Sequence, residues 1–155
     1  TLEPLHEHLF EYKTHMMQNY GAGVQACYRG PRLYDTPETQ AAVTEVIQWY
    51  KKYRDILNSD MIHLRRPDAR DWDGFIHVNP HKKEKGLAMF FNPTHQEITR
   101  TIHIPLYYTG LTQTARIREK EQKPVTYKLN RDYTVELTVK IPANGYTWYV
   151  VEAAD

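Results

Sequence analysis

Cys27 is the only cysteine in the sequence, and it is the first residue to consider for chemistry. One cysteine cannot form an internal disulfide, so it assigns the protein to no redox compartment. A thiol can act as a nucleophile when a histidine activates it, and histidines occur elsewhere in this chain. The alternative is a small buried residue that follows a glycine-containing loop.

Arg29 and Arg32 lie close to this cysteine, on either side of a Gly-Pro pair and beside two tyrosines. Guanidinium groups on a rigid loop can bind a carboxylate or a cluster of sugar hydroxyls. The alternative is that they form salt bridges with Asp35 or Glu38. We therefore take Cys27, Arg29 and Arg32 as the candidate substrate-binding residues and predict no catalytic residue in this chain.

The densest group of charges contains three aspartates and three arginines: Asp68, Asp71, Asp73, Arg65, Arg66 and Arg70. Two carboxylates can perform general acid and base catalysis if a pocket holds them at the required separation. Their spacing in a turn does not establish that separation. The alternative is a solvated loop of paired charges between two strands.

Three histidines near the N-terminus, His6, His8 and His15, are potential metal ligands. Positions two apart do not face each other on a helix, and His8 and His15 are separated by about two turns. Solvated side chains therefore explain them better, and the sequence predicts neither a metal nor a cofactor.

Composition excludes few classes of protein. A formal net charge of +1 gives no reason to expect a nucleic-acid partner. No run of about eighteen apolar residues predicts a membrane span, and the N-terminus does not resemble a signal peptide. Because the sequence begins at Thr1, we expect a processed protein or a piece of a longer one.

The first part of the chain is expected to be helical. Apolar residues recur at helical spacing from about Leu5 to Met17. A second, amphipathic helix should extend to Leu57, starting either with Thr36 as N-cap before Pro37 or with Asp35 as N-cap in a capping box with Glu38.

After about Asp60 the period changes from helical to alternating, which is typical of strands. The stretch Lys85 to Thr94 is apolar on both faces and predicts a central strand. We expect strands over Met61 to Arg65, Trp72 to Val78, most of Lys85 to Thr94, Ile98 to Ile104, Thr114 to Arg118, Val125 to Leu129, Tyr133 to Val139 and Tyr146 to Glu152.

Two turns suggest how the last strands pair. Asn130-Arg131-Asp132 predicts a meander hairpin, and Asn144-Gly145 predicts a type I′ turn that joins the last two strands. The fold class expected is mainly β: an antiparallel β-sandwich of about eight strands preceded by two α-helices. The domains expected are a helical segment, residues 1–59, and a sandwich, residues 60–155.

Three motifs together suggest a family. Trp-Tyr-Lys-Lys-Tyr-Arg at 49–54 is followed by Gly-Leu-Ala-Met-Phe-Phe-Asn-Pro-Thr at 86–94 and by Gly-Tyr-Thr-Trp-Tyr-Val-Val-Glu at 145–152. The combination resembles the C-terminal region of α-galactosidase-like glycoside hydrolases, where the last helices of a TIM barrel lead into an antiparallel β-sandwich. The likeness covers nearly the whole chain, but its motifs are structural.

The resemblance implies that the catalytic aspartates lie on barrel strands that this sequence does not contain. It implies a non-catalytic accessory region whose partner is the missing catalytic barrel, and it is compatible with a secreted or periplasmic parent enzyme. The alternative is a free-standing module that binds carbohydrate or another protein through exposed rings such as Tyr107, Tyr108 or Trp72. A row of exposed rings on one face of the sandwich would favour the module. Burial of these rings, together with an exposed apolar face on the helix from Val43 to Leu57, would favour the accessory region.

Overall fold

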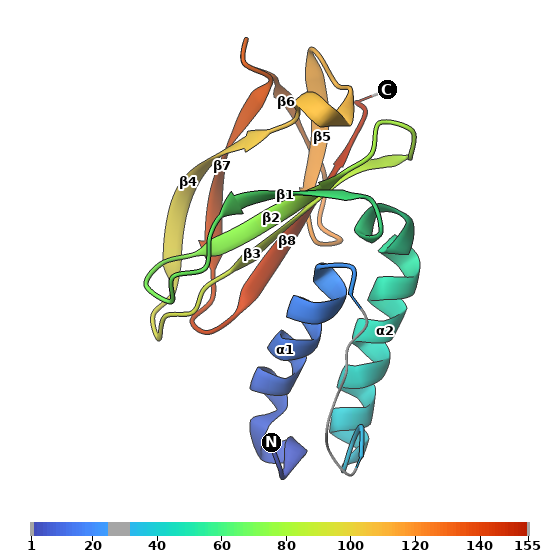
Figure 1. Ribbon diagram of the computed structural model, residues 1–155, viewed down its shortest axis with the longest axis vertical. Coiled ribbons are helices and arrows are strands. Elements are labelled where there is room, and N and C mark those ends of the chain that lie inside the picture. The colour runs from blue at the N-terminus through green and yellow to red at the C-terminus, as the bar shows by residue number, and fades with distance from the viewer. Residues whose placement is uncertain (1, 25–31, 155) are drawn as a thin grey trace. The chain divides into compact units, whose positions relative to one another are not determined.

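The computed structural model describes residues 2–24 and 32–154, and the chain divides into two compact units, Thr1–Leu57 and Asn58–Asp155. The first unit is helical and the second consists of strands (Figure 1). Among the residues described there are two α-helices and eight strands, so the predicted mainly β class is confirmed.

The helical unit contains a 3₁₀ turn, η1 (Leu5–His8), which leads into helix α1 (Leu9–Gly21) and, after a connection, helix α2 (Pro37–Leu57). The predicted first helix is therefore present, but it begins as a 3₁₀ turn and ends at Gly21 rather than near Met17. The rings of Tyr20 and Tyr50 lie 5.2 Å apart and Lys13 Nζ lies 2.9 Å from Glu45 Oε1, so both contacts join α1 to α2.

Helix α2 begins with the first of the two predicted caps. Thr36 Oγ1 accepts a hydrogen bond from the Thr39 backbone N–H at 3.3 Å, and Thr39 Oγ1 accepts one from the Thr36 N–H at 2.9 Å. This is a reciprocal capping box in which Thr39, and not Glu38, is the third helical residue. Pro37 occupies the first helical position, where its missing N–H costs nothing.

The sandwich unit contains two antiparallel sheets. Their strands are β1 (Asp60–Arg65), β2 (Asp73–Val78), β3 (Glu84–Phe91), β4 (Ile98–Pro105), β5 (Thr114–Glu119), β6 (Val125–Lys128), β7 (Thr134–Ile141) and β8 (Tyr146–Glu152). Six strands form one sheet in the order β1-β2-β3-β8-β5-β6, and β4 and β7 form the other sheet.

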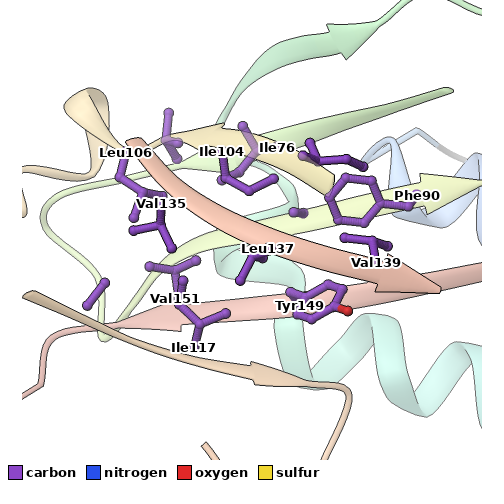
Figure 2. Close-up of a cluster of buried hydrophobic side chains, with 14 of the residues drawn as sticks. Ile76, Phe90, Ile104, Leu106, Ile117, Val135, Leu137, Val139, Tyr149 and Val151 are labelled. Carbon is purple, nitrogen blue, oxygen red and sulfur yellow. The ribbon is translucent and has the colours of Figure 1, made fainter. Parts of the chain in front are cut away.

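The core of this unit lies between the two sheets. Figure 2 shows side chains of β4 and β7, including Ile104, Leu137 and Val139, pointing toward Phe90 and Tyr149 of the larger sheet. Burial of such side chains stabilises a fold by roughly 1.5–3 kcal/mol each. The strict alternation of β7, where every second residue is buried, places one of its faces in this core.

Strand β3 is central, as the sequence predicted, because it pairs with β2 on one side and β8 on the other. Ala88 and Phe90 belong to the core between the sheets, while Leu87 and Met89, on the opposite face, are also fully buried. Gly74 of β2 allows close pairing here, since a Cβ at this position would lie 2.5 Å from the Met89 carbonyl oxygen.

Both predicted hairpins at the end of the chain are wrong. β6 pairs with β5, β7 pairs with β4, and β8 pairs with β3 and β5, so the chain changes sheet at each of the two turns. The inner faces of both sheets are apolar, so an alternating pattern indicates which face of a strand is buried but does not identify its partner.

The turn before β8 also differs from the predicted type I′ turn. The Gly145 N–H donates to the Pro142 carbonyl at 3.1 Å, and of the two central residues, Ala143 and Asn144, only Asn144 has a positive φ, of 52°. A positive φ at the third position alone is typical of a type II turn, which does not impose a two-residue hairpin.

Within the described part of the chain, neither helix is both long and apolar enough to cross a membrane.

Candidate functional site

Of the three candidate substrate-binding residues, the structure describes only Arg32, because Cys27 and Arg29 lie outside the described residues. The Arg32 Nη2 lies 3.1 Å from Glu3 Oε2, and both side chains are partly exposed. The arginine therefore forms a salt bridge, but with Glu3 rather than with Asp35 or Glu38. Binding of a substrate by this loop stays a prediction.

His6 lies beside Asp35, 29 residues further along the chain. Asp35 Oδ2 lies 2.8 Å from His6 Nδ1 and accepts the His6 backbone N–H at 3.0 Å. Partial desolvation acts to raise the pKa of Asp35, but these contacts and a hydrogen bond from Thr39 outweigh it and lower the pKa well below its usual value. This carboxylate joins the N-terminal segment to the start of α2.

Two of the three N-terminal histidines, His6 and His8, face a carboxylate. His6 is held by Asp35, and His8 Nδ1 lies 3.7 Å from Glu11 Oε1. Over residues 2–24 and 32–154, no group of three or more His, Cys, Asp or Glu side chains is arranged to hold a metal ion.

The first aspartate of the acidic cluster is held by an arginine. Asp68 accepts two hydrogen bonds from the Arg65 guanidinium, at 2.8 and 3.2 Å, and also accepts the backbone N–H groups of Arg70 and Asp71. The Arg65 hydrogen bond is the largest cause of a pKa of Asp68 far below the usual range. Asp68 therefore stays ionised and closes the turn between β1 and β2.

The other two aspartates of this cluster have different environments. Asp71 Oδ1 lies 3.2 Å from Arg100 Nε of β4 and accepts the Trp72 backbone N–H at 2.8 Å. Burial raises the pKa of Asp73 above its usual value. Asp68 and Asp71 are thus engaged by arginines and backbone amides, as the alternative of a loop of paired charges predicted.

Two exposed aromatic rings lie in the η2 turn (Tyr107–Thr109), which follows β4. Tyr107 and Tyr108 are each 62% exposed, and their rings lie 5.1 Å apart at 88°. Trp72 differs, since it packs on the sandwich core with its ring 5.8 Å from that of Phe90. Of the three rings that the sequence suggested as a platform, two are therefore exposed and one is partly buried.

A third ring, Tyr133, belongs to the same site and was not predicted. It follows the turn between β6 and β7, and its ring lies 5.4 Å from that of Tyr107 at 73°. We call Tyr107, Tyr108 and Tyr133 the tyrosine triad. Tyr107 and Tyr133 are 26 positions apart, and nothing in the alternating sequence indicates that they lie close together. They meet because Pro105 pairs with Thr134 at the end of β4 and β7.

No family model matches the chain, and no curated protein sequence matches it. Solved structures do match it. They include a β-L-arabinopyranosidase from Geobacillus stearothermophilus (12% identity, TM-score 0.61), α-galactosidase I from Mortierella vinacea (16%, 0.60) and an α-amylase from Geobacillus thermoleovorans (14%, 0.59).

These three structures cover 93–94% of this chain. The chain has a fold found in glycoside hydrolases. It spans only 31%, 36% and 33%, respectively, of the three solved chains, about a third of each. At these identities the likeness shows the fold alone.

Proposed function

We propose that this chain is the C-terminal accessory region of a glycoside hydrolase of the α-galactosidase type, and that it supports a catalytic barrel contributed by another part of the parent protein. The observation that carries the proposal is the extent of the structural likeness. The sandwich unit makes up less than two thirds of the chain, whereas the match covers 94% of the chain. The match therefore includes residues of the helical unit as well.

The chemistry of the described residues supports a non-catalytic role. Glycoside hydrolysis needs two carboxyl groups facing the same glycosidic bond, one to protonate the leaving group and one to act as base or nucleophile. In the acidic cluster, Asp68 and Asp71 instead receive hydrogen bonds from Arg65 and Arg100. This pairing lowers the pKa of Asp68, and it gives both side chains a structural role in the turn between β1 and β2.

The substrate class is proposed from the same likeness. The matching structures are named as an α-galactosidase, a β-L-arabinopyranosidase and an α-amylase, all of which act on glycosides. We propose that the parent of this chain also acts on a glycoside and that the chain contributes stability rather than catalytic groups.

An activity assay with a longer polypeptide tests this proposal. The assay compares two proteins on p-nitrophenyl α-galactoside and p-nitrophenyl β-L-arabinopyranoside. One is this chain alone, and the other is a longer polypeptide that also includes the residues encoded upstream of Thr1. We expect turnover by the longer polypeptide and none by the chain alone. Hydrolysis by the chain alone that is lost on Asp68→Asn, Asp71→Asn or Asp73→Asn, or an upstream frame without βα repeats, would contradict the proposal.

A further inference from the structure

The exposure of Tyr107 and Tyr108 is the first observation that points to a ligand. At 62% each they are more exposed than any other large hydrophobic side chain of the described residues, and they are adjacent. Aromatic rings of this size usually bury 150–250 Å² each, so leaving two of them in water sacrifices a considerable stabilising contribution. Neighbouring exposed rings are more informative than scattered ones.

The second observation is that the turn holding these rings is rigidly anchored. Leu106, immediately before them, is fully buried and points into the sandwich core (Figure 2). Thr109, immediately after Tyr108, is also fully buried, and its N–H donates to the Leu106 carbonyl at 3.0 Å. Gly110 then ends the turn in the left-handed region, with φ of 80°. Anchors on both sides keep the two rings at the surface.

The third observation is backbone strain at Tyr133, which has φ of 63°. A bulky residue in the left-handed region is unusual, and such a backbone conformation is strained. Its carbonyl accepts the Leu106 N–H at 2.9 Å, and its ring supports that of Tyr107. Asparagine or glycine would adopt this backbone more easily, but neither would provide the ring, which packs on the sandwich core and against Tyr107.

The chemistry of the triad favours an uncharged ligand with both apolar and hydroxyl groups. Aromatic faces can pack against the C–H groups of a sugar ring, while phenol hydroxyls can exchange hydrogen bonds with its hydroxyls. The nearby carboxylate of Asp132 accepts the Thr134 hydroxyl at 2.7 Å and the Thr134 N–H at 3.2 Å, so it is engaged within its own turn.

From these observations we infer that the tyrosine triad is a binding site on the sandwich unit for a neutral sugar residue of an oligosaccharide. Tyr107 and Tyr108 provide two ring surfaces at nearly a right angle, and Tyr133 supports the first of them. The choice of a sugar rests on the proposed function, but the binding itself requires no catalytic barrel.

Titration by nuclear magnetic resonance tests this site directly. The ¹⁵N-labelled chain would be titrated with maltoheptaose and, separately, with raffinose, each to about 10 mM to detect weak binding. We expect saturable shifts of the amide resonances of residues 107–110 and 133 with at least one oligosaccharide. Loss of stacking in Tyr107→Ala and Tyr108→Ala should raise Kd about five- to tenfold.

The control variants separate ring contact from loss of folding. Tyr34→Ala removes another exposed tyrosine, 44% exposed in the helical unit, and should leave Kd unchanged. Tyr107→Phe and Tyr108→Phe keep the ring faces and should weaken binding less than alanine does. Each variant must first show the chemical-shift dispersion of the parent chain.

Three results would overturn the inference: no saturable shift with either oligosaccharide, equal binding by the alanine variants, or shifts at these amides that depend on protein concentration alone and so indicate self-association. None of them would contradict the accessory role, which the activity assay decides separately. Conversely, sugar binding would stand if no barrel were encoded upstream.

Discussion

Asn92 shows how a single side chain connects two loops of the sandwich unit. It is 2% exposed, and its Nδ2 donates to the carbonyls of Gln96, Ile141 and Pro142 at 2.8–3.2 Å. Its Oδ1 accepts the backbone N–H and the hydroxyl of Thr94. The loop after β3 is thereby attached to the turn between β7 and β8.

Asn92→Ala is expected to destabilise the chain by about 2 kcal/mol, because it removes the buried side chain whose hydrogen bonds join the two loops. Asn92→Asp, which retains the acceptor for Thr94 but loses the NH₂ group, should also destabilise. Urea unfolding followed by circular dichroism measures both. Asn130→Ala is the control, since that amide lies in an exposed turn and donates to the Thr134 hydroxyl; a loss as large as that of Asn92→Ala would contradict this account.

At the scale of elements, an ion-pair cluster connects β5 to β8 within the larger sheet. Glu152, 7% exposed, lies 3.2 Å from Arg116 Nη2 and 2.9 Å from Arg118 Nη1. Desolvation acts to raise the pKa of Glu152, but the hydrogen bonds from the two arginines outweigh it and lower the pKa below its usual value.

This direction determines how stability depends on pH. The pKa of this carboxyl group is lower in the folded state than in the unfolded state, where it is about 4.3 for glutamate. The group therefore stabilises the fold at pH values above the unfolded pKa, and this contribution is lost as the pH falls through the folded pKa. Glu152→Gln should therefore cost about 1–2 kcal/mol at neutral pH, and the difference from the parent chain should diminish toward about pH 3.

Denaturant unfolding of both proteins at the two pH values provides the measurement. Glu136→Gln is the matched control, because that side chain is 59% exposed and faces His103 at 3.5 Å. A Glu152→Gln effect that is independent of pH would show that the ion pairs contribute no stability.

At the scale of the whole molecule, the sandwich is built from pairings between distant segments. In the larger sheet β3 pairs with β8. Among the strands described, the smaller sheet contains only β4 and β7, which are not consecutive in the sequence. Loops must close before such contacts form, which makes folding slow.

We expect the sandwich to refold in about milliseconds to seconds, the range typical of β-sandwiches. Stopped-flow tryptophan fluorescence of a Trp49→Phe variant, in which Trp72 and Trp148 of the sandwich unit remain, measures this phase. Completion of the whole fluorescence change within the dead time would contradict the expectation. Ellipticity at 222 nm should recover partly before the fluorescence, because helices form from local contacts.

Features that depend on neighbours in sequence could be predicted well. Thr36 and Pro37 start α2 because capping and proline geometry act within one turn, and β3 was recognised as central because both of its faces are apolar. The partners of the last strands could not be predicted, since alternation is the same whichever sheet a strand joins. The Arg32 partner, Glu3, was missed for a related reason, because 29 residues separate them.

The sequence by itself determined the order of two helices and eight strands in the described chain, and thereby the mainly β class, because hydrophobic period and turn chemistry are local properties. Only the tertiary structure decided which strands pair and which polar groups meet. It brought Arg100 to Asp71, 29 residues away, and it placed Tyr133 against Tyr107, since pairing of β4 with β7 aligns residues that are distant in the chain. The candidate site is a product of that pairing.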